Sequence, residues 1–395
     1  MKPPPPLPGR GDALFSIRLN RVNETCKEES NQPMGNRTAL FAIHQEEGGK
    51  IVDFAGWDMP LQYSSITNEH KLVREQTGLF DVSHMGRFWF EGQNAGQAID
   101  AMFASNVASL SDGQTKYTVV CNEQGGVKDD VLVTRLSADC YFAVVNASNR
   151  EKLLEWFQAK LPQSVTFIDR TFESGMIAVQ GRDAVPIVDG LIAGVAPSGW
   201  SAADMAYYTG QTLSDGIVVT RTGYTGEDGF EVIAPNEPIQ DFWRQARQAG
   251  AHPAGLGARD SLRLEMGFPL YGHELNEETT PLEAGIKRIV ELEGRDFIGK
   301  EALAQMQEAG VPRRRIAFQL DAPGVPRQGC ALYDGDQPIG EATSGGFSPV
   351  LAKGIGLALV NAGHAKPEAL QVEIRNKKVP AHRVRLPFVE KRVKA

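Results

Sequence analysis

Several kinds of residue are scarce in this sequence, and each scarcity argues against a class of protein. Only four of the 395 residues are cysteines, and none of them stands in a C-x-x-C pair, which argues against a disulfide framework or a zinc site. The seven histidines form no H-E-x-x-H cluster, so a metal site has little support. No apolar run reaches the roughly 18 residues of a membrane span, so no membrane segment is expected.

Positive charge is also in short supply. The chain has 41 Lys and Arg against 49 Asp and Glu, a net charge of -8. A basic run such as Arg313-Arg314-Arg315 is too short to reverse this balance, so we expect no nucleic-acid partner, which would need a basic surface. With 42% hydrophobic residues, the composition is typical of a globular protein that is large enough for two or three cores.

Residues 1–35 differ in composition from the rest. They contain the proline run Pro3–Pro6 and the polar stretch Asn23–Asn36, which cannot bury a core, so we expect a disordered leader. Three arginines hint at a mitochondrial presequence, but the acidic residues around them argue against it, and we favour Met34 as the real start. The protein is expected in the cytoplasm if bacterial, which we favour, or in the mitochondrial matrix if eukaryotic.

The most informative stretch runs from Tyr117 to Asn146. Its alternating apolar runs Tyr117–Cys121 and Val131–Thr134 flank a Gly-Gly turn and predict a β-hairpin, and Tyr141–Asn146 predicts the next strand. Helix signals on both sides, including a capping box at Ser148–Glu151, indicate an α+β unit with helices on one face of an antiparallel sheet.

Two adjacent carboxylates, Asp129 and Asp130, stand at the start of the second strand of this hairpin. Neighbouring strand residues point to opposite faces, so one carboxylate can meet solvent or end the turn while the other faces inward. A carboxylate on a buried face is costly without a partner. Taken alone, such a pair more often ends a turn, and a chemical role depends on the rest of the chain.

A strand predicted over Leu79–Gly86 carries Asp81, Ser83 and His84. A Ser-His-Asp hydrolase is one interpretation, but adjacent residues on a strand face apart and the chain has no G-x-S-x-G elbow. We therefore expect His84 to be a hydrogen-bonded core or pocket-wall residue.

A second α+β unit follows, with a Gly-rich connector at residues 221–229 that carries Tyr224 between two strands. Such a connector is typical of a loop that holds a ligand, although no helix follows it as in a P-loop. In the helix after Gly255, Arg259 and Arg263 share a face, which is either a solvated basic face or an anion clamp.

After about residue 292 the pattern changes to short strands at regular spacing, which predicts a small all-β barrel or jelly roll. We expect three parts: the leader at 1–35, two intertwined α+β units at 36–292, and the β-barrel at 293–395. The predicted strands are Ile316–Leu320, Cys330–Tyr333, Glu341–Ser344, Gly356–Leu359, Leu370–Ile374 and Val379–Val384.

Eight motifs occur in one order: FAGWDMPLQY, LFDVSHMG, GGVKDD, VVNASNREK, RTGYTGEDGFEV, GLGARDSLRLE, PLYGHEL and SGGFSP. Together they resemble the aminomethyltransferase (T-protein) family of the glycine cleavage system, over roughly residues 38–390. The resemblance implies an α+β cloverleaf with tetrahydrofolate in a central cavity. It also implies that the enzyme takes the aminomethyl group from the lipoyl arm of the H-protein, releases ammonia and forms 5,10-methylene-tetrahydrofolate.

The resemblance further implies a set of site residues. Asp130 holds the position of the essential carboxylate, which would stabilise a cationic, iminium-like carbon and orient the proton of the folate nitrogen. Arg259 matches the arginine beside the folate-contacting glutamate. The vertebrate members have a tyrosine near the C-terminus, whereas the tail Glu390–Val393 of this chain has none. The folate contacts carry over to Tyr117, Asn146, Tyr224 and Glu231.

Three related groups are the alternatives. Dimethylglycine and sarcosine oxidising enzymes would need an N-terminal G-x-G-x-x-G, which is absent. A folate-dependent demethylase of sulfonium compounds is the nearest enzyme alternative. A non-enzymatic folate-binding factor of iron–sulfur assembly would carry K-G-C-Y-x-G-Q-E, whereas this chain has Phe268–Glu274 without the cysteine.

Overall fold

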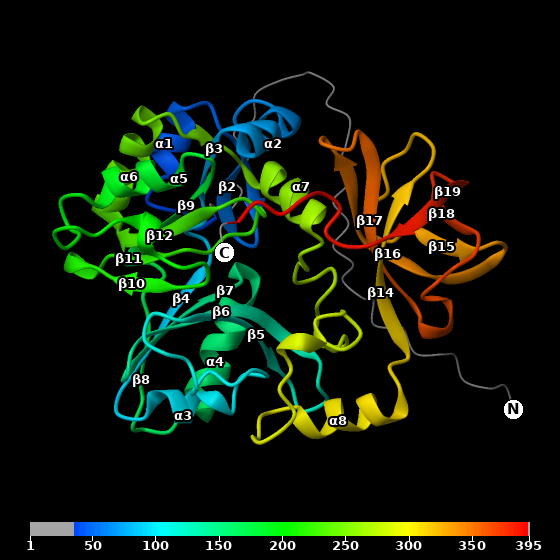
Figure 1. Cartoon of the computed structure of the whole chain (residues 1–395), viewed down its shortest axis with the longest axis horizontal. Coiled ribbons are helices and arrows are strands. Elements are labelled where there is room, and N and C mark those ends of the chain that lie inside the picture. Colours follow the sequence, from blue (N-terminus) through cyan, green and yellow to red (C-terminus); the bar gives the residue numbers. More distant parts are fainter. Residues whose placement is uncertain (1–34, 394–395) are drawn as a thin grey trace, which may run out of the picture. The chain divides into compact units, whose positions relative to one another are not determined.

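The computed structural model describes residues 35–393. The expected leader therefore lies outside the described residues except for Gly35, and so does the start that we favour at Met34. Within residues 35–393 there are eight α-helices (Figure 1): α1 Phe41–Glu46, α2 Ile66–Glu75, α3 Ala95–Asp100, α4 Arg150–Lys160, α5 Ala184–Ile192, α6 Asn236–Gln248, α7 Leu256–Met266 and α8 Lys300–Ala309. Short 3₁₀ turns occupy Ala147–Asn149, Ala202–Asp204, Ser214–Gly216, Lys287–Ile289 and Ala362–His364.

The hairpin predicted around the Asp-Asp pair lies in a five-stranded antiparallel sheet of order β5-β6-β7-β4-β8. Helices α3 and α4 cover one face, because Ile99 and Phe157 pack against Val131 and Val133 in one apolar cluster. The strands are β4 Gly86–Glu91, β5 Thr115–Cys121, β6 Val127–Ser137, β7 Cys140–Val145 and β8 Thr166–Asp169.

The second unit is a six-stranded sheet of order β10-β11-β12-β9-β3-β13, in which β13 alone runs parallel to its neighbour. Ile239 and Trp243 of α6 pack on its strand residues Val179 and Val232. A further apolar cluster joins Trp89 and Phe142 of the first sheet to Phe80 of this one. The strands are β3 Thr77–Asp81, β9 Ser174–Gly181, β10 Gly210–Thr212, β11 Val218–Thr220, β12 Gly229–Pro235 and β13 His252–Pro253.

The C-terminal strands close into a six-stranded barrel of order β14-β17-β16-β15-β18-β19, drawn in orange and red in Figure 1. Its interior is filled by apolar side chains such as Phe318, Leu332 and Val360. The strands are β14 Arg313–Leu320, β15 Ala331–Asp334, β16 Gln337–Ser348, β17 Lys353–Asn361, β18 Leu370–Ile374 and β19 Lys377–Val384, and a separate ribbon pairs β1 Lys50–Phe54 with β2 Trp57–Gln62. The expected class, antiparallel sheets with packed helices and a C-terminal barrel, is confirmed.

The predicted strand at Leu79–Gly86 is wrong in its second half. β3 ends at Asp81, because the Asp81 carboxylate accepts a hydrogen bond from the backbone N–H of Ser83 at 2.8 Å and turns the chain. Ser83 and His84 therefore lie in a connecting loop between β3 and β4 and not on a strand.

Candidate functional site

The Asp-Asp pair lies in β6, and the register confirms that its members face opposite ways. Asp130 pairs with Val119 and lies on the face of Tyr117, whereas Asp129 pairs with Val120 on the face of the apolar core. Asp129 is nevertheless fully buried, so the expectation that one carboxylate meets solvent or merely ends the turn is wrong. Asp130 is half-buried.

Asp129 can be buried because amide donors surround it. The backbone N–H of Asn146 donates to its Oδ2 at 2.9 Å, and the side-chain amides of Asn146 and Asn149 donate to its Oδ1 at 2.8 and 2.5 Å. The Asn146 amide also donates to Oδ1 of Asp130 at 2.9 Å, and the Tyr117 hydroxyl donates to Oδ2 at 2.9 Å. All four carboxylate oxygens of the pair therefore accept hydrogen bonds, and the pair is satisfied before any ligand binds.

The capping box expected at Ser148–Glu151 is wrong, because a 3₁₀ turn at Ala147–Asn149 precedes α4 and the N-cap position falls on Asn149 instead of Ser148. Helix α4 does begin at Arg150, but its N-cap residue Asn149 makes no side-chain hydrogen bond to the helix. Its amide donates to Asp129 instead. A side chain that is favoured at helix N-termini thus supports the site, which no local pattern could indicate.

Burial is the largest influence on both carboxyls and raises the pKa of each above its ordinary value. The charge of Asp130 adds to this effect on the pKa of Asp129, while the Asn146 and Asn149 amides oppose it. Burial likewise raises the pKa of Tyr117, with the charge of Asp130 as the next cause, so its phenol stays a hydrogen-bond donor.

Tyr224, Glu231 and Arg259 come from three segments of the second unit: the 221–229 connector, β12 and α7. The Arg259 guanidinium lies over the Tyr224 ring, 4.8 Å from its centroid. The Phe268 ring stacks on the Tyr224 ring, with 5.6 Å between the two ring centroids. The Tyr224 hydroxyl donates to the Pro269 carbonyl. The Arg259 side chain makes no hydrogen bond or ion pair with the described residues, so its five guanidinium N–H donors are available to a ligand.

Glu231 is 5% exposed and accepts one hydrogen bond, from the Thr222 hydroxyl at 2.5 Å. Burial raises the pKa of Glu231, against the hydrogen bond from Thr222 and the positive charge of Arg259. A buried carboxylate with one oxygen already hydrogen-bonded and a guanidinium nearby can bind a ligand that presents both a donor and an acceptor.

Arg259 and Arg263 do not act as one anion clamp. The Arg263 side chain is 2% exposed and is engaged by protein groups: Asp260 at 2.8 Å, Glu274 at 3.1 Å and Ser344 of the barrel at 2.9 Å. It therefore ties α7 to the barrel, and only Arg259 is left for the site.

The Gly-rich connector is closed at its base by the ion pair of Arg221 with Asp228 at 2.7 Å. Gly226 has a φ of +81°, and a Cβ there would lie 2.1 Å from the Met266 sulfur of α7. The glycine is thus required for the close approach of this loop to α7, which holds Tyr224 next to Arg259.

The two halves of the predicted site meet at a backbone junction between the sheets. Thr115 N–H at the start of β5 donates to the Tyr208 carbonyl at 2.9 Å, and Gly210 N–H donates to Gly113 at 2.7 Å. The charge of Asp130 is near enough to raise the pKa of Tyr224, after the larger effect of burial. The Tyr117 and Asp130 side chains of the first sheet thus lie near Tyr224, Arg259 lies near both Tyr224 and Glu231, and Asn146 holds the carboxylate pair.

His84 is buried, as expected, but it is not hydrogen-bonded. Its Nδ1 has no partner among the described residues. Burial lowers the pKa of His84 to about 3, and the positive charges of Arg259 and Arg87 add to this against the charge of Asp81. The imidazole is therefore neutral, and its environment does not support a hydrolase triad.

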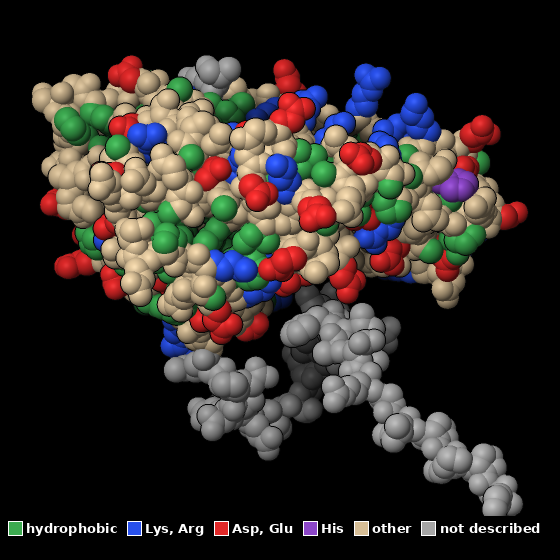
Figure 2. Space-filling model, turned by 90° about the horizontal axis from the view of Figure 1, so that it is seen from below, with side chains coloured by type: hydrophobic (Ala, Val, Ile, Leu, Met, Phe, Trp, Pro, Cys, Tyr) green, Lys and Arg blue, Asp and Glu red, His purple; other side chains and the backbone are tan. Residues whose placement is uncertain are grey.

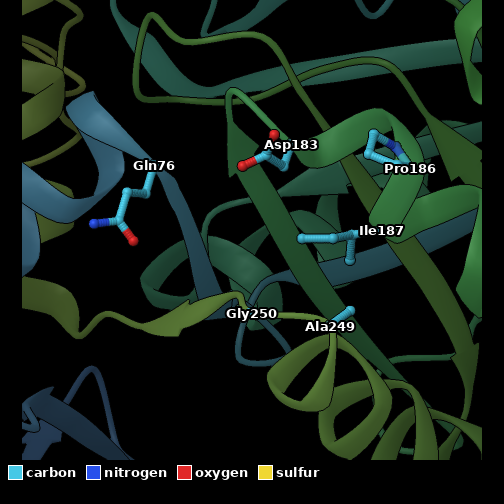
Figure 3. Close-up of a pocket in the computed structure, with 6 residues that line it drawn as sticks. All are labelled: Gln76, Asp183, Pro186, Ile187, Ala249 and Gly250. Atoms are coloured by element: carbon cyan, nitrogen blue, oxygen red, sulfur yellow. The ribbon is translucent and has the colours of Figure 1, made fainter.

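A surface pocket of about 350 Å³ lies apart from these residues (Figure 3). It is formed where α2, α5 and α6 meet, and none of the predicted site residues lines it. Its lining residues are Gln76, Asp183, Pro186, Ile187, Ala249 and Gly250.

On the face seen in Figure 2, side chains of both charges are interspersed. No helix within residues 35–393 is long and apolar enough to cross a membrane.

Comparison with known proteins accounts for nearly all of the described chain. Residues 40–294 match the family model of the GCVT N-terminal domain, and residues 313–390 match that of the glycine cleavage T-protein C-terminal barrel domain. The aminomethyltransferase of Halothermothrix orenii is 40% identical over 361 residues, which are 89% of this chain and 99% of that protein. The aminomethyltransferase of Rubrobacter xylanophilus is 43% identical over 363 residues, 90% of this chain and 95% of that protein.

A solved structure agrees with these matches. The crystal structure of the glycine cleavage system aminomethyltransferase T from Bartonella henselae superposes with a TM-score of 0.84 at 30% identity, covering 90% of this chain and 99% of that one. Fold and relatives together define an enzyme of the transferase class, an aminomethyltransferase. The chain belongs to the glycine cleavage T-protein family.

Proposed function

We propose that this aminomethyltransferase uses tetrahydrofolate to take the aminomethyl group from the lipoyl arm of the H-protein, releasing ammonia and forming 5,10-methylene-tetrahydrofolate. The observation that carries the proposal is the Asp130 carboxylate, held by Tyr117 and Asn146 on the face of β6 that looks away from the core. Membership of the T-protein family supplies the reaction class in which such a carboxylate has a use.

Asp130 acts on charge that develops during the transfer. When the bond from the aminomethyl carbon to its sulfur or nitrogen weakens, that carbon becomes electron-deficient and cationic. A carboxylate that is already oriented by two hydrogen bonds stabilises this charge without reorganising, and it can accept the proton that the attacking folate nitrogen must lose. The partial burial of Asp130 strengthens the effect, because little water screens it.

The residues of the second unit fit the flat, polar-edged ring of a folate. The Tyr224 ring, fixed by Phe268 and Arg259, supplies an aromatic surface. Glu231 and Arg259 supply an acceptor and donors for a heterocyclic rim. We assign folate contact to Tyr117, Asn146, Tyr224, Glu231 and Arg259.

The direct test is transfer from a purified, lipoylated and aminomethylated H-protein to tetrahydrofolate. We expect equal amounts of ammonia and methylene-tetrahydrofolate, and none of either with H-protein that lacks the lipoyl group. Saturating tetrahydrofolate should also raise the melting temperature, because a ligand that binds only the folded state stabilises it. Absence of both turnover and a thermal shift would overturn the proposal.

A further inference from the structure

Asp129 is a buried charge that takes no direct part in the proposed transfer. It is fully buried on the face of β6 that packs on the apolar core, opposite to the face of Asp130. Removing a carboxylate from water is costly, and an apolar side chain at this position would avoid that cost. The Asp129 carboxylate is therefore expected to hold an arrangement that an apolar side chain could not hold.

Asn149 is the closest of the three amide donors that surround this carboxylate. Its side-chain amide donates to Oδ1 of Asp129 at 2.5 Å, and the residue is 3% exposed. Asn149 occupies the N-cap position of α4, where asparagine is favoured because its side chain can bind the helix end, but it makes no such bond. Its backbone N–H donates to the Asn146 carbonyl at 3.0 Å, in the short turn that joins β7 to α4. The Asn149 side chain is thus used at Asp129 and not at the helix end.

The Asn146 amide connects the two carboxylates. Its nitrogen donates to Oδ1 of Asp129 at 2.8 Å and to Oδ1 of Asp130 at 2.9 Å, and the Asp130 carbonyl lies 3.1 Å from it. An amide nitrogen carries only two hydrogens, so the hydrogen that is directed at Asp129 fixes the direction of the other. The hydrogen bond that Asp130 receives therefore depends on where the Asp129 carboxylate is held.

We propose that Asn149 is a positioning residue for the aminomethyl transfer: it holds the Asp129 carboxylate, which fixes the Asn146 amide, whose second N–H orients Asp130. This inference rests on the proposed function. Within residues 35–393 Asn149 makes no hydrogen bond to Asp130, so its effect reaches that carboxylate through Asp129 and Asn146.

The orientation of Asp130 matters because the proposed transfer creates positive charge only along the reaction path. Loss of the Asn149 donor leaves Oδ1 of Asp129 with the Asn146 amide as its hydrogen-bond donor. The Asp129 carboxylate is then free to rotate, and the direction of the Asn146 amide is no longer fixed. A carboxylate that must reorient during the reaction stabilises a cationic carbon less well than one that is oriented beforehand.

The first measurement is the turnover of Asn149→Ala with aminomethylated, lipoylated H-protein and tetrahydrofolate. We expect kcat of the folded protein to fall about tenfold or more, the scale for misplacing a reacting group, while KM for tetrahydrofolate changes much less. Leu153→Ala is the matched control, because Leu153 is fully buried in the apolar core one turn further along α4. It should lower the melting temperature at least as much and leave kcat of the folded protein unchanged.

A double variant separates positioning of Asp130 from an independent effect. If Asn149 acts only through Asp130, adding Asn149→Ala to Asp130→Asn should slow turnover no further. Losses of kcat that multiply in the double variant would overturn the inference, and so would an unchanged kcat in Asn149→Ala. An equal loss of kcat in Leu153→Ala would show a purely structural residue. Failure of the unaltered protein to form methylene-tetrahydrofolate would instead overturn the proposed function.

Discussion

The two halves of the proposed pocket differ in how much hydrogen-bonding capacity they leave open. In the first sheet every oxygen of Asp129 and Asp130 already accepts a hydrogen bond, chiefly from Asn146. In the second unit the Glu231 carboxylate accepts one hydrogen bond, and the Arg259 guanidinium makes none with the described residues. The first half is thus organised in advance, while the second has donors and acceptors available for a ligand.

This difference suggests a division of labour between chemistry and recognition. A carboxylate that must stabilise transient charge gains from being fixed beforehand, since reorganisation during the reaction costs free energy. Groups that recognise a ligand rim are used only when the ligand arrives, and they then gain hydrogen bonds that were not made before. Variants in the first half should therefore change turnover or folding, and variants at Arg259 or Glu231 should change affinity.

The largest expected effect on turnover is that of Asp130→Asn. The change keeps the size of the side chain but removes its charge, so turnover should fall by roughly a hundredfold, the scale for loss of one electrostatic stabiliser. Folate affinity should change much less. Ammonia release from aminomethylated H-protein measures the first quantity and calorimetry the second. Near-normal turnover of Asp130→Asn would show that the Asp130 carboxylate does not stabilise charge during the transfer.

Asp129→Asn is the matched control, and its expected effect is on folding. The new amide would place N–H groups against the Asn146 and Asn149 donors in a fully buried position. The free energy of unfolding should drop by about 2 kcal/mol or more, the cost of losing hydrogen bonds to a buried charge. Denaturant unfolding measures it. Unchanged stability would mean that Asp129 is not the support described above.

A second comparison uses the two arginines of α7. Arg263→Ala leaves Glu274 buried without its ion-pair partner and should lower the free energy of unfolding by about 3–5 kcal/mol. Arg259→Ala removes no ion pair or hydrogen bond and should leave stability nearly unchanged, while weakening tetrahydrofolate binding about tenfold or more. A large loss of stability in Arg259→Ala would contradict the assignment of Arg259 to ligand binding.

The raised pKa of Asp130 predicts a smaller, pH-dependent effect. Burial makes the folded protein hold the Asp130 proton to a higher pH than an unfolded aspartate, which loses it near its ordinary pKa of about 4. This group's contribution to stability is therefore fully present below pH of about 4 and is lost as the pH rises from there through the raised pKa of the folded protein. Asp130→Asn should show a flatter loss of melting temperature across that window. Parallel curves for the two proteins would contradict the raised pKa.

The smallest expected effect is that of removing the leader. A chain that begins at Met34 should keep the turnover and the melting temperature of the full chain, because residues 1–33 have a composition that cannot form a core. Transfer assays and thermal unfolding of the two chains side by side test this. A clear loss of either quantity would show that the leader contributes to the folded protein.

The sequence by itself determined the elements and much of the first half of the site. The alternation of apolar residues predicted β5, β6 and the barrel strands, because burial on one face of a strand imposes a period of two. The predicted hairpin and its next strand put Asp129, Asp130 and Asn146 on neighbouring strands, whereas the site roles of Asp130 and Asn146 came from the resemblance to the T-protein family.

Only the tertiary structure decided how those residues are used. In the folded protein Asp129 is buried, and the amide of Asn149 donates to its carboxylate instead of capping α4. Arg263 binds Glu274 and Ser344 of the barrel, whereas the Arg259 guanidinium has no hydrogen bond or ion pair among the described residues. These outcomes depend on contacts between segments far apart in sequence, and local propensity carries no information about which distant group will supply a buried partner.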